Sequence, residues 1–215
     1  MKIAPSILSC DFSCMGNEVK SIINAGAEFV HFDVMDGRFV PNIFFAPDIT
    51  KSLRKFSNIL FDIHLMVTDP INHIERFALS GADIISFHVE SKSDVNKTIN
   101  SIKKRELKPG IVINPKTLPE EIIKYINDDV YMIVIMGVEP GFSGQKFIPE
   151  TTEKVARVKQ IIEKINPNIL IEVDGGVGEF NIKKLREAGA DVCVSGSYVF
   201  SSKDRKKAIK LLKDS

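Results

Sequence analysis

The chain alternates short, almost continuously apolar runs with longer amphipathic runs from one end to the other. Eight apolar runs, rich in Val, Ile and Phe, lie at residues 2–8, 29–34, 59–67, 84–89, 110–113, 130–136, 169–173 and 192–195. A run that is apolar at successive positions is typical of a parallel strand covered on both faces. The intervening runs carry apolar stripes at helical spacing, for example at 18–25 and 153–165. The pattern predicts an α/β protein with alternating strands and helices.

A weak internal repeat indicates how many strand–helix units the chain contains. The sequence Ala-Gly-Ala followed by an acidic residue and an apolar run surrounds Gly26 and Gly189, and Gly81 lies in the similar Ser-Gly-Ala-Asp. A glycine at this position suits the left-handed end of a helix just before a strand. The three glycines lie 55 and 108 residues apart, close to two and four units of about 27 residues, as expected for eight units in 215 residues.

Two architectures fit this alternation, a closed barrel and an open doubly wound sheet. A dinucleotide-binding open sheet needs a glycine-rich turn after its first strand, but residues 9–13 read Ser-Cys-Asp-Phe-Ser. The count of eight and the even spacing favour a (β/α)8 TIM barrel. No linker or low-complexity segment divides the chain, so we expect a single domain over residues 1–215.

Charge and cysteine content argue against several classes of partner. Lys and Arg number 29 against 28 Asp and Glu, for a net charge of +1, which gives no electrostatic basis for binding nucleic acid or an anionic membrane. No apolar run approaches the roughly 20 residues of a membrane helix. Three cysteines, Cys10, Cys14 and Cys193, predict reduced thiols rather than disulfides or structural zinc. We therefore expect a cytoplasmic protein.

Polar residues collect where the predicted strands end, which is the functional end of a barrel. His31 and Asp33 are two residues apart on one strand and so face the same way. With His64 and Asp174 at the same height, two imidazoles and two carboxylates would converge, a ligand set that suits zinc, iron(II), manganese or cobalt. Singly, each residue has a simpler interpretation, a hydrogen-bonded core histidine or a helix cap. Four at matching positions favour a metal site.

Glycine clusters follow the last three strands and suggest a phosphate site. They are Gly141-Phe142-Ser143-Gly144, Gly175-Gly176 and Gly196-Ser197. Glycines let backbone N–H groups approach an anion closely, and the loops after strands seven and eight are a recurrent phosphate site in barrels. The alternative is that these glycines only make tight turns. The roles of His88 and of Met35, Met66 and Met136 near strand ends stay open, between core packing and, for the methionines, a water-excluding lid.

Several ordered segments resemble the ribulose-phosphate 3-epimerase family, and the resemblance extends over essentially the whole chain. They are Ala-Pro-Ser-Ile-Leu-Ser-Cys-Asp at 4–11, His-Phe-Asp-Val-Met-Asp-Gly-Arg-Phe-Val-Pro-Asn at 31–42, Asp-Ile-His-Leu-Met-Val at 62–67, Val-Glu-Pro-Gly-Phe-Ser-Gly-Gln-Lys-Phe at 138–147 and Val-Asp-Gly-Gly at 173–176. Gly137 and Ser143 depart from the family pattern, which puts loop detail in doubt but removes no expected ligand or base.

The resemblance implies a (β/α)8 barrel that interconverts D-ribulose 5-phosphate and D-xylulose 5-phosphate in the pentose phosphate pathway. It implies one divalent metal ion per chain on His31, Asp33, His64 and Asp174, with zinc or iron(II) expected before manganese or cobalt. Asp33 and Asp174 would be the acid/base pair that inverts C3 through a metal-stabilised enediolate. Substrate-binding residues would be Ser9, His64, Gly141, Phe142, Ser143, Gly144, Asp174, Gly175, Gly176, Gly196 and Ser197. We also expect a homo-oligomer.

Three other functions remain open at this stage. One is an epimerase of a six-carbon ketose phosphate, which would use the same chemistry. A second is a related phosphosugar decarboxylase or aldolase, although these use a Lys among the catalytic acids at a strand end and none is present here. The third is a non-catalytic phosphosugar-binding barrel, which would not need a metal-bound acid/base pair.

Overall fold

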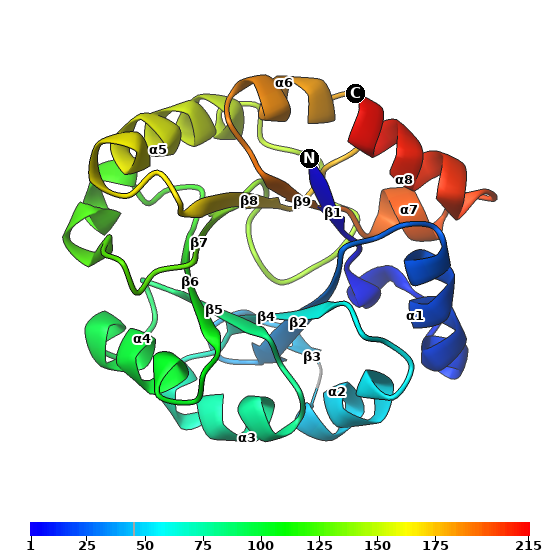
Figure 1. Cartoon of the computed structure of the whole chain (residues 1–215), viewed down its shortest axis with the longest axis horizontal. Coiled ribbons are helices and arrows are strands. Elements are labelled where there is room, and N and C mark those ends of the chain that lie inside the picture. The colour runs from blue at the N-terminus through cyan, green and yellow to red at the C-terminus, as the bar shows by residue number, and fades with distance from the viewer. Residues whose placement is uncertain (45) are drawn as a thin grey trace.

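The computed structural model describes residues 1–44 and 46–215, whose strands form a barrel surrounded by helices (Figure 1). Eight of the described strands are parallel: β1 (Lys2–Ala4), β2 (Phe29–Asp36), β4 (Leu60–Met66), β5 (Ile84–His88), β6 (Lys108–Ile113), β7 (Met132–Met136), β8 (Leu170–Asp174) and β9 (Val192–Val194). The short β3 (Ile43–Phe44) pairs antiparallel with the end of β2. This arrangement confirms the predicted (β/α)8 fold.

Backbone hydrogen bonds close the ring where the first and second strands meet. The strand order runs from β1 through β9, β8, β7, β6, β5 and β4 to β2. The His31 N–H donates to the Pro5 carbonyl at 3.1 Å, and the Glu28 N–H donates to the Ile3 carbonyl at 3.2 Å. Closure brings the carboxyl ends of all eight parallel strands to one rim, where β2 and β8 can contribute to a shared site.

Helices cover the outside of the barrel in chain order. They are α1 (Met15–Asn24), α2 (Pro47–Arg54), α3 (Ile74–Leu79), α4 (Val95–Lys103), α5 (Thr151–Ile165), α6 (Ile182–Glu187), α7 (Ser197–Phe200) and α8 (Arg205–Asp214), with 3-10 turns at Ile7–Ser9, Phe12–Cys14, Pro70–Asn72 and Pro119–Tyr125. The predicted stripe of α5 is buried at Val155, Val158 and Ile162. Within the described chain, no helix combines the length and the apolar character needed to span a membrane.

The three repeated glycines end helices as predicted. Gly26, Gly81 and Gly189 have φ values of +97°, +91° and +104°, which place them in the left-handed region. Each follows a helix, respectively α1, α3 and α6, and the chain enters a strand within three residues. The conformation is one that glycine adopts without a steric penalty from Cβ.

Two predicted elements differ from the structure. The first apolar run forms a strand only as far as Ala4, because Pro5 lacks an N–H and the Ser6 hydroxyl then accepts from the Leu8 N–H to start a 3-10 turn. Between β6 and β7 the described connection contains only the 3-10 turn Pro119–Tyr125 and no α-helix. Pro115 before this turn, Pro119 at its first position and Asn127-Asp128-Asp129 after it leave little room for a longer helix.

Inward-facing residues form layers across the barrel because side chains alternate along each strand. Apolar residues such as Phe29, Val134 and Val192 are fully buried in one cluster. Strand register places His31 beside Asp62 and, two residues further on, Asp33 beside His64. The second pair therefore lies one layer nearer the rim than the first.

Candidate active site and metal centre

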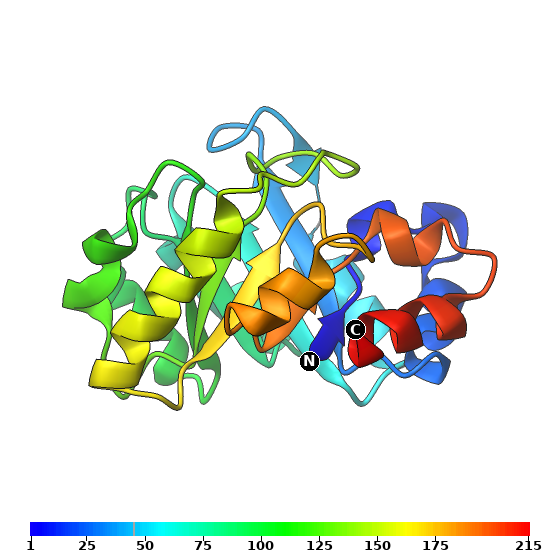
Figure 2. The same cartoon turned by 90° about the horizontal axis from the view of Figure 1, so that it is seen from above.

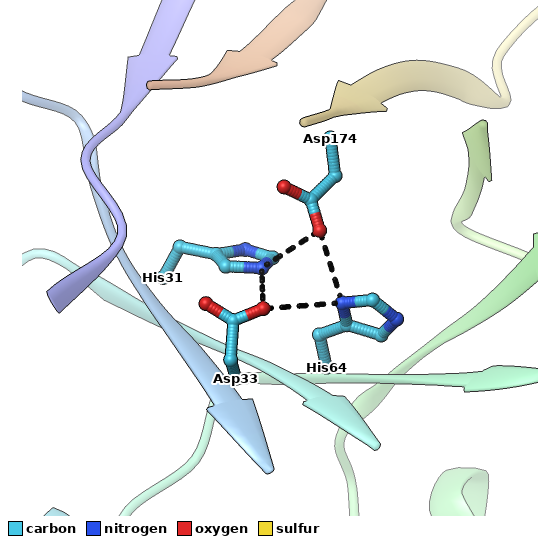
Figure 3. A group of neighbouring side chains, drawn as sticks. All are labelled: His31, Asp33, His64 and Asp174. Carbon is cyan, nitrogen blue, oxygen red and sulfur yellow. Dashed lines mark hydrogen bonds and ion pairs between the residues drawn. The ribbon is translucent and has the colours of Figure 1, made fainter. Parts of the chain in front are cut away.

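Four polar side chains converge near the carboxyl ends of β2, β4 and β8 (Figure 3). The Nε2 atom of His31 lies 3.7 Å from Asp33 Oδ1 and 3.6 Å from Asp174 Oδ2. The Nδ1 atom of His64 lies 3.6 Å from Asp33 Oδ1 and 3.1 Å from Asp174 Oδ2. All four residues are buried, and their atoms form a four-sided cluster that alternates nitrogen and oxygen.

The cluster has the dimensions and the chemistry of a divalent metal site. Ligands about 2.0–2.2 Å from a tetrahedral ion lie about 3.3–3.6 Å from one another, close to the observed separations. His31 Nε2 has no hydrogen-bond partner although it is completely buried. A buried polar atom rarely stays unpaired, so this lone pair is explained if it faces a cation. Two imidazole nitrogens and two carboxylates thus fit a divalent metal ion.

The Asp62 carboxylate beneath the cluster holds His31 in one orientation. Asp62 Oδ2 lies 2.6 Å from His31 Nδ1, and Glu172 Oε1 lies 3.7 Å from the same nitrogen. Both acids are fully buried. With its Nδ1 proton donated to Asp62, His31 presents Nε2 to the cluster, which is the arrangement expected of a metal-binding histidine.

His64 is held from its other side by a second histidine. The Nε2 atoms of His64 and His88 are 2.9 Å apart, and His88 Nδ1 lies 3.2 Å from Glu90 Oε2. Both rings are fully buried. Burial lowers the pKa of His88 to about 4, more than the hydrogen bond to Glu90 raises it. His88 is therefore a neutral ring that contacts a predicted ligand.

Burial and charge shift the pKa values of the acids in different directions. Burial would raise the pKa of Asp33, but the nearby imidazoles of His31 and His64 hold it below its usual value. Asp174 follows the same pattern, chiefly through His31. The pKa of Glu172 is raised well above its usual value by burial and by the neighbouring Asp62. The surroundings thus favour ionised carboxylates in the rim layer and oppose ionisation of Glu172 in the layer beneath it.

The surroundings of the two cluster histidines raise their pKa values. Burial lowers the pKa of His31, but the charges of Asp62 and Asp174 raise it well above its usual value. Burial also lowers the pKa of His64, and hydrogen bonds to Asp174 and Asp33 raise it overall. Anionic surroundings that favour a proton on an imidazole favour a bound cation for the same electrostatic reason.

A cleft opens above the cluster. Its lining includes Ser6, Ser9, Asp33, Met35, Met66, Met136, Gly141, Phe142, Ser143, Gly144, Asp174, Gly175, Gly176, Gly196 and Ser197. None of the described residues that line it is Lys or Arg. An anion bound here would therefore depend on backbone N–H groups and hydroxyls.

Loops from two distant parts of the sequence meet above this cleft. The β2–β3 connection and the loop after β7 rise side by side beyond the rim (Figure 2). The Asn42 side-chain amide donates to the Gly141 carbonyl at 3.0 Å, which ties one loop to the other. Gly141 also packs against Val40, since an added Cβ would lie 3.3 Å from the Val40 side chain. The two loops form one wall of the cleft.

The glycines after β8 are required by close packing. Gly176 has φ +67°, and a Cβ there would lie 2.7 Å from the Phe147 backbone nitrogen. Gly137 is equally confined, because its Cβ would lie 2.4 Å from the Gly175 carbonyl oxygen. The Gly137 N–H donates to the Asp174 carbonyl at 2.6 Å. The loops after β7 and β8 are thus held against each other at the backbone level.

The structure brings together the residues that the sequence singled out. His31, Asp33, His64 and Asp174 form the buried cluster, and the predicted substrate-binding residues other than His64 line the cleft. His64 belongs to the cluster, of which Asp33 and Asp174 line the cleft. The three methionines also line the cleft. Within the described chain, Cys10, Cys14 and Cys193 form no disulfide.

Sequence reasoning missed several supporting residues. Ser6 donates to Asp33 Oδ2 at 2.5 Å, and neither Asp62, Glu172 nor Glu90 was given a role. A signal for two of them was present, since Asp62 and Glu172 each precede a predicted ligand by two residues in an otherwise apolar run. Residues so spaced on a strand face the same way, which places these acids directly beneath the cluster.

Solved structures with the same fold define the class of protein as a (β/α)8 barrel. A 3-hexulose-6-phosphate synthase superposes with a TM-score of 0.73 at 13% identity, over 100% of this chain and 99% of that one. The orotidine 5'-phosphate decarboxylase of Pyrococcus horikoshii gives 0.71 at 15% identity, over 100% and 98%. At such low identity these similarities establish the fold alone.

Sequence comparison identifies the family. The profile of the Ribulose-phosphate 3 epimerase family matches residues 2–200. The ribulose-phosphate 3-epimerase of Helicobacter pylori strain J99 is 46% identical over 100% of this chain and 97% of its own length. The Bacillus subtilis enzyme of that name is 44% identical over 100% and 99%, and the Escherichia coli K12 enzyme is 44% identical over 96% and 92%. The chain belongs to the ribulose-phosphate 3-epimerase family.

Proposed function

We propose that this protein interconverts D-ribulose 5-phosphate and D-xylulose 5-phosphate, as an isomerase of the pentose phosphate pathway. Family membership and the full-length relatives of that name support the activity. The observation that carries the proposal is the pair Asp33 and Asp174, which face each other across two imidazoles at the floor of the cleft (Figure 3). Inversion of a carbon needs two proton-transfer groups, one for each face.

One divalent metal ion would be held by His31 Nε2, Asp33, His64 Nδ1 and Asp174. The nitrogen and oxygen donors suit zinc or iron(II) first, then manganese or cobalt. Such an ion supplies Lewis-acid polarisation of the substrate's ketone oxygen, which makes the adjacent C3 proton easier to remove.

The two aspartates would transfer the proton from opposite sides. Asp33 enters the cluster from β2 and Asp174 from β8, on opposite sides of the site (Figure 3). One carboxylate takes the C3 proton from one face, and the other delivers a proton to the opposite face. The roles exchange when the reaction runs in reverse. Ser6 keeps Asp33 oriented through the bond to Oδ2.

The cleft would hold the rest of the substrate. The loop at 141–144, with Gly175, Gly176, Gly196 and Ser197, would bind the phosphate through backbone N–H groups and serine hydroxyls. Ser9 and His64 would contact the sugar. Met35, Met66 and Met136 lie along the cleft and would exclude water from the reacting carbon.

Family membership and composition support proposals about the domain extent, the assembly and the location of the protein. We propose a single barrel domain over residues 1–215, a homo-oligomeric assembly and a cytoplasmic location. A phosphosugar is the expected small-molecule partner, with no role for nucleic acid, since the net charge of +1 gives no attraction to a polyanion.

Metal analysis combined with a substrate panel tests this function. The purified protein should hold one divalent ion per chain and epimerise D-ribulose 5-phosphate. Free ribulose should be a very poor substrate, because binding energy from the remote phosphate helps to position the reacting carbon. A six-carbon ketose phosphate should react more slowly. Faster turnover of the six-carbon substrate, or equal turnover of free ribulose, would contradict the assignment.

A further inference from the structure

A chain of hydrogen bonds runs from the cluster towards the surface through two residues to which nothing so far gives a role in the reaction. It leads from His64 Nε2 to His88 Nε2 at 2.9 Å, then from His88 Nδ1 to Glu90 Oε2 at 3.2 Å. Glu90 Oε1 accepts from the Asn114 backbone N–H at 2.8 Å and from the Thr117 hydroxyl. The His64 and His88 side chains are fully buried, whereas that of Glu90 is 25% exposed.

The outer end of this chain fixes the direction in which every proton is donated. A backbone N–H can only donate, so Glu90 Oε1 must be an acceptor. A carboxylate that accepts at Oε1 also accepts at Oε2, which requires the His88 proton to be on Nδ1. The Nε2 atoms of His88 and His64 are 2.9 Å apart, so one must donate to the other. With the His88 proton on Nδ1, the lone pair of that ring is on Nε2, which accepts from His64. The His64 proton is thereby placed on Nε2.

The His64 end of the hydrogen-bond chain requires the same direction of proton donation for an independent reason. His64 Nδ1 faces Asp174 and Asp33, where the proposed metal ion would bind. A neutral imidazole that ligates through Nδ1 carries its proton on Nε2, and the His88 lone pair accepts that proton. Both ends of the chain therefore specify one tautomer for each ring.

We propose that His88 and Glu90 are positioning residues that hold His64 in the Nε2–H tautomer and present its Nδ1 lone pair to the metal ion. The proposal rests on the metal site put forward above. It also makes the two histidine ligands unlike each other: His31 would bind through Nε2 and be anchored by Asp62, whereas His64 would bind through Nδ1 and be anchored by His88. Outer partners of metal ligands commonly alter affinity by about 10–100-fold.

The most informative substitution is Glu90→Gln, which changes one atom at a residue outside the cluster. The glutamine oxygen would stay on the Asn114 N–H, because an amide nitrogen there would face another donor. The amide nitrogen then faces His88 Nδ1 and donates to it, so the His88 proton moves to Nε2. His64 would in turn carry its proton on Nδ1, where the metal ion should bind. Metal affinity should fall although no ligand has been changed.

Zinc affinity, measured by chelator competition, tests the positioning role of His88 and Glu90, and a matched control variant is available. Glu90→Gln should weaken zinc binding about 10–100-fold. Glu121→Gln makes the same chemical change in the 3-10 turn Pro119–Tyr125, at a carboxylate that accepts only from the Leu118 N–H among the described hydrogen bonds. The zinc affinity of this variant should stay within about twofold of the parent. His88→Phe keeps a ring but no acceptor and should weaken binding, whereas His88→Gln retains an acceptor oxygen and should restore part of the affinity.

A measurement on the parent protein removes any dependence on variants that fold poorly. The chain has four histidines, so long-range ¹H–¹⁵N correlations of the zinc-loaded protein can assign each ring tautomer. We expect the proton on Nε2 of His64, on Nδ1 of His31 and on Nδ1 of His88. A proton on Nε2 of His88, or equal zinc affinity in the parent and Glu90→Gln, would overturn the positioning role alone. A parent protein that binds no zinc or other divalent ion would overturn the metal site as well.

Discussion

The cluster of His31, Asp33, His64 and Asp174 and the cleft above it are built in opposite ways. The cluster consists of side chains on strands β2, β4 and β8, buried in the barrel and tied to further buried side chains such as Asp62 and His88. Loop residues make up much of the cleft lining, among them glycines at 141, 144, 175, 176 and 196. Chemistry that needs fixed acids and nitrogens therefore depends on which side chains are present. Anion binding by backbone groups depends instead on which side chains are absent.

This difference predicts that the cluster loses function when a side chain is removed, whereas the cleft wall loses function when a side chain is added. Removal of a proposed metal ligand should have the largest effect on activity. His64→Ala should reduce bound metal from one ion per chain to near zero and should reduce epimerase activity in proportion, since it removes one donor of four. We expect metal affinity to fall by more than the roughly 100-fold seen for outer partners.

Ser86→Ala provides the control for that substitution. Ser86 lies beside His64 in the strand register, is equally buried, and its hydroxyl has no hydrogen-bond partner. Metal content and activity should both stay near the parent values. A full complement of metal in His64→Ala, measured by elemental analysis, would show that the cluster is not the metal site.

A smaller effect is expected from adding a methyl group to the cleft wall. Gly176→Ala and Gly144→Ala both place a Cβ at positive φ, +67° and +74°, at a cost of about 1–3 kcal/mol each. Only Gly176 also meets backbone, whereas nothing lies within 4 Å of a Cβ at Gly144. Gly176→Ala should therefore raise the KM for the phosphosugar about tenfold or more while metal content is unchanged. Equal KM values for the two variants would contradict the role of close backbone approach.

Removal of the Ser197 hydroxyl from the proposed phosphate site should have the smallest effect. Ser197→Ala deletes one of several donors and a net contribution of about 0.5–1.5 kcal/mol, or roughly 2- to 10-fold in KM. The loss should disappear when free ribulose replaces the phosphorylated substrate, since there is then no phosphate to bind. The same fold-change on both substrates would place Ser197 elsewhere in the mechanism.

The sequence predicted the barrel and singled out the four cluster residues, but it did not predict which buried side chains hydrogen-bond to them. His31 and Asp33 share a face of one strand, and periodicity alone shows this. Which residues of β4 and β8 lie beside them depends on the stagger between strands, and the spacing of residues along the chain does not specify it. That is why Asp62, Glu172 and His88 received no partner from sequence. Ser6 was missed for another reason, because Pro5 ends β1 earlier than the apolar run suggests.

The central claim is that Asp33 and Asp174 act on opposite faces of one carbon, and C3 proton exchange in deuterated water tests it most directly. Asn at either position keeps the shape and one oxygen ligand but cannot accept a proton, so epimerisation should fall by at least about 10²- to 10⁴-fold. Metal content is measured first, so that only fully loaded variants are compared. One variant should exchange the C3 proton of ribulose 5-phosphate without inverting C3. The other variant should exchange only the C3 proton of xylulose 5-phosphate. Fully loaded variants that epimerise near the parent rate, or that both exchange the same epimer, would reduce the two aspartates to metal ligands only.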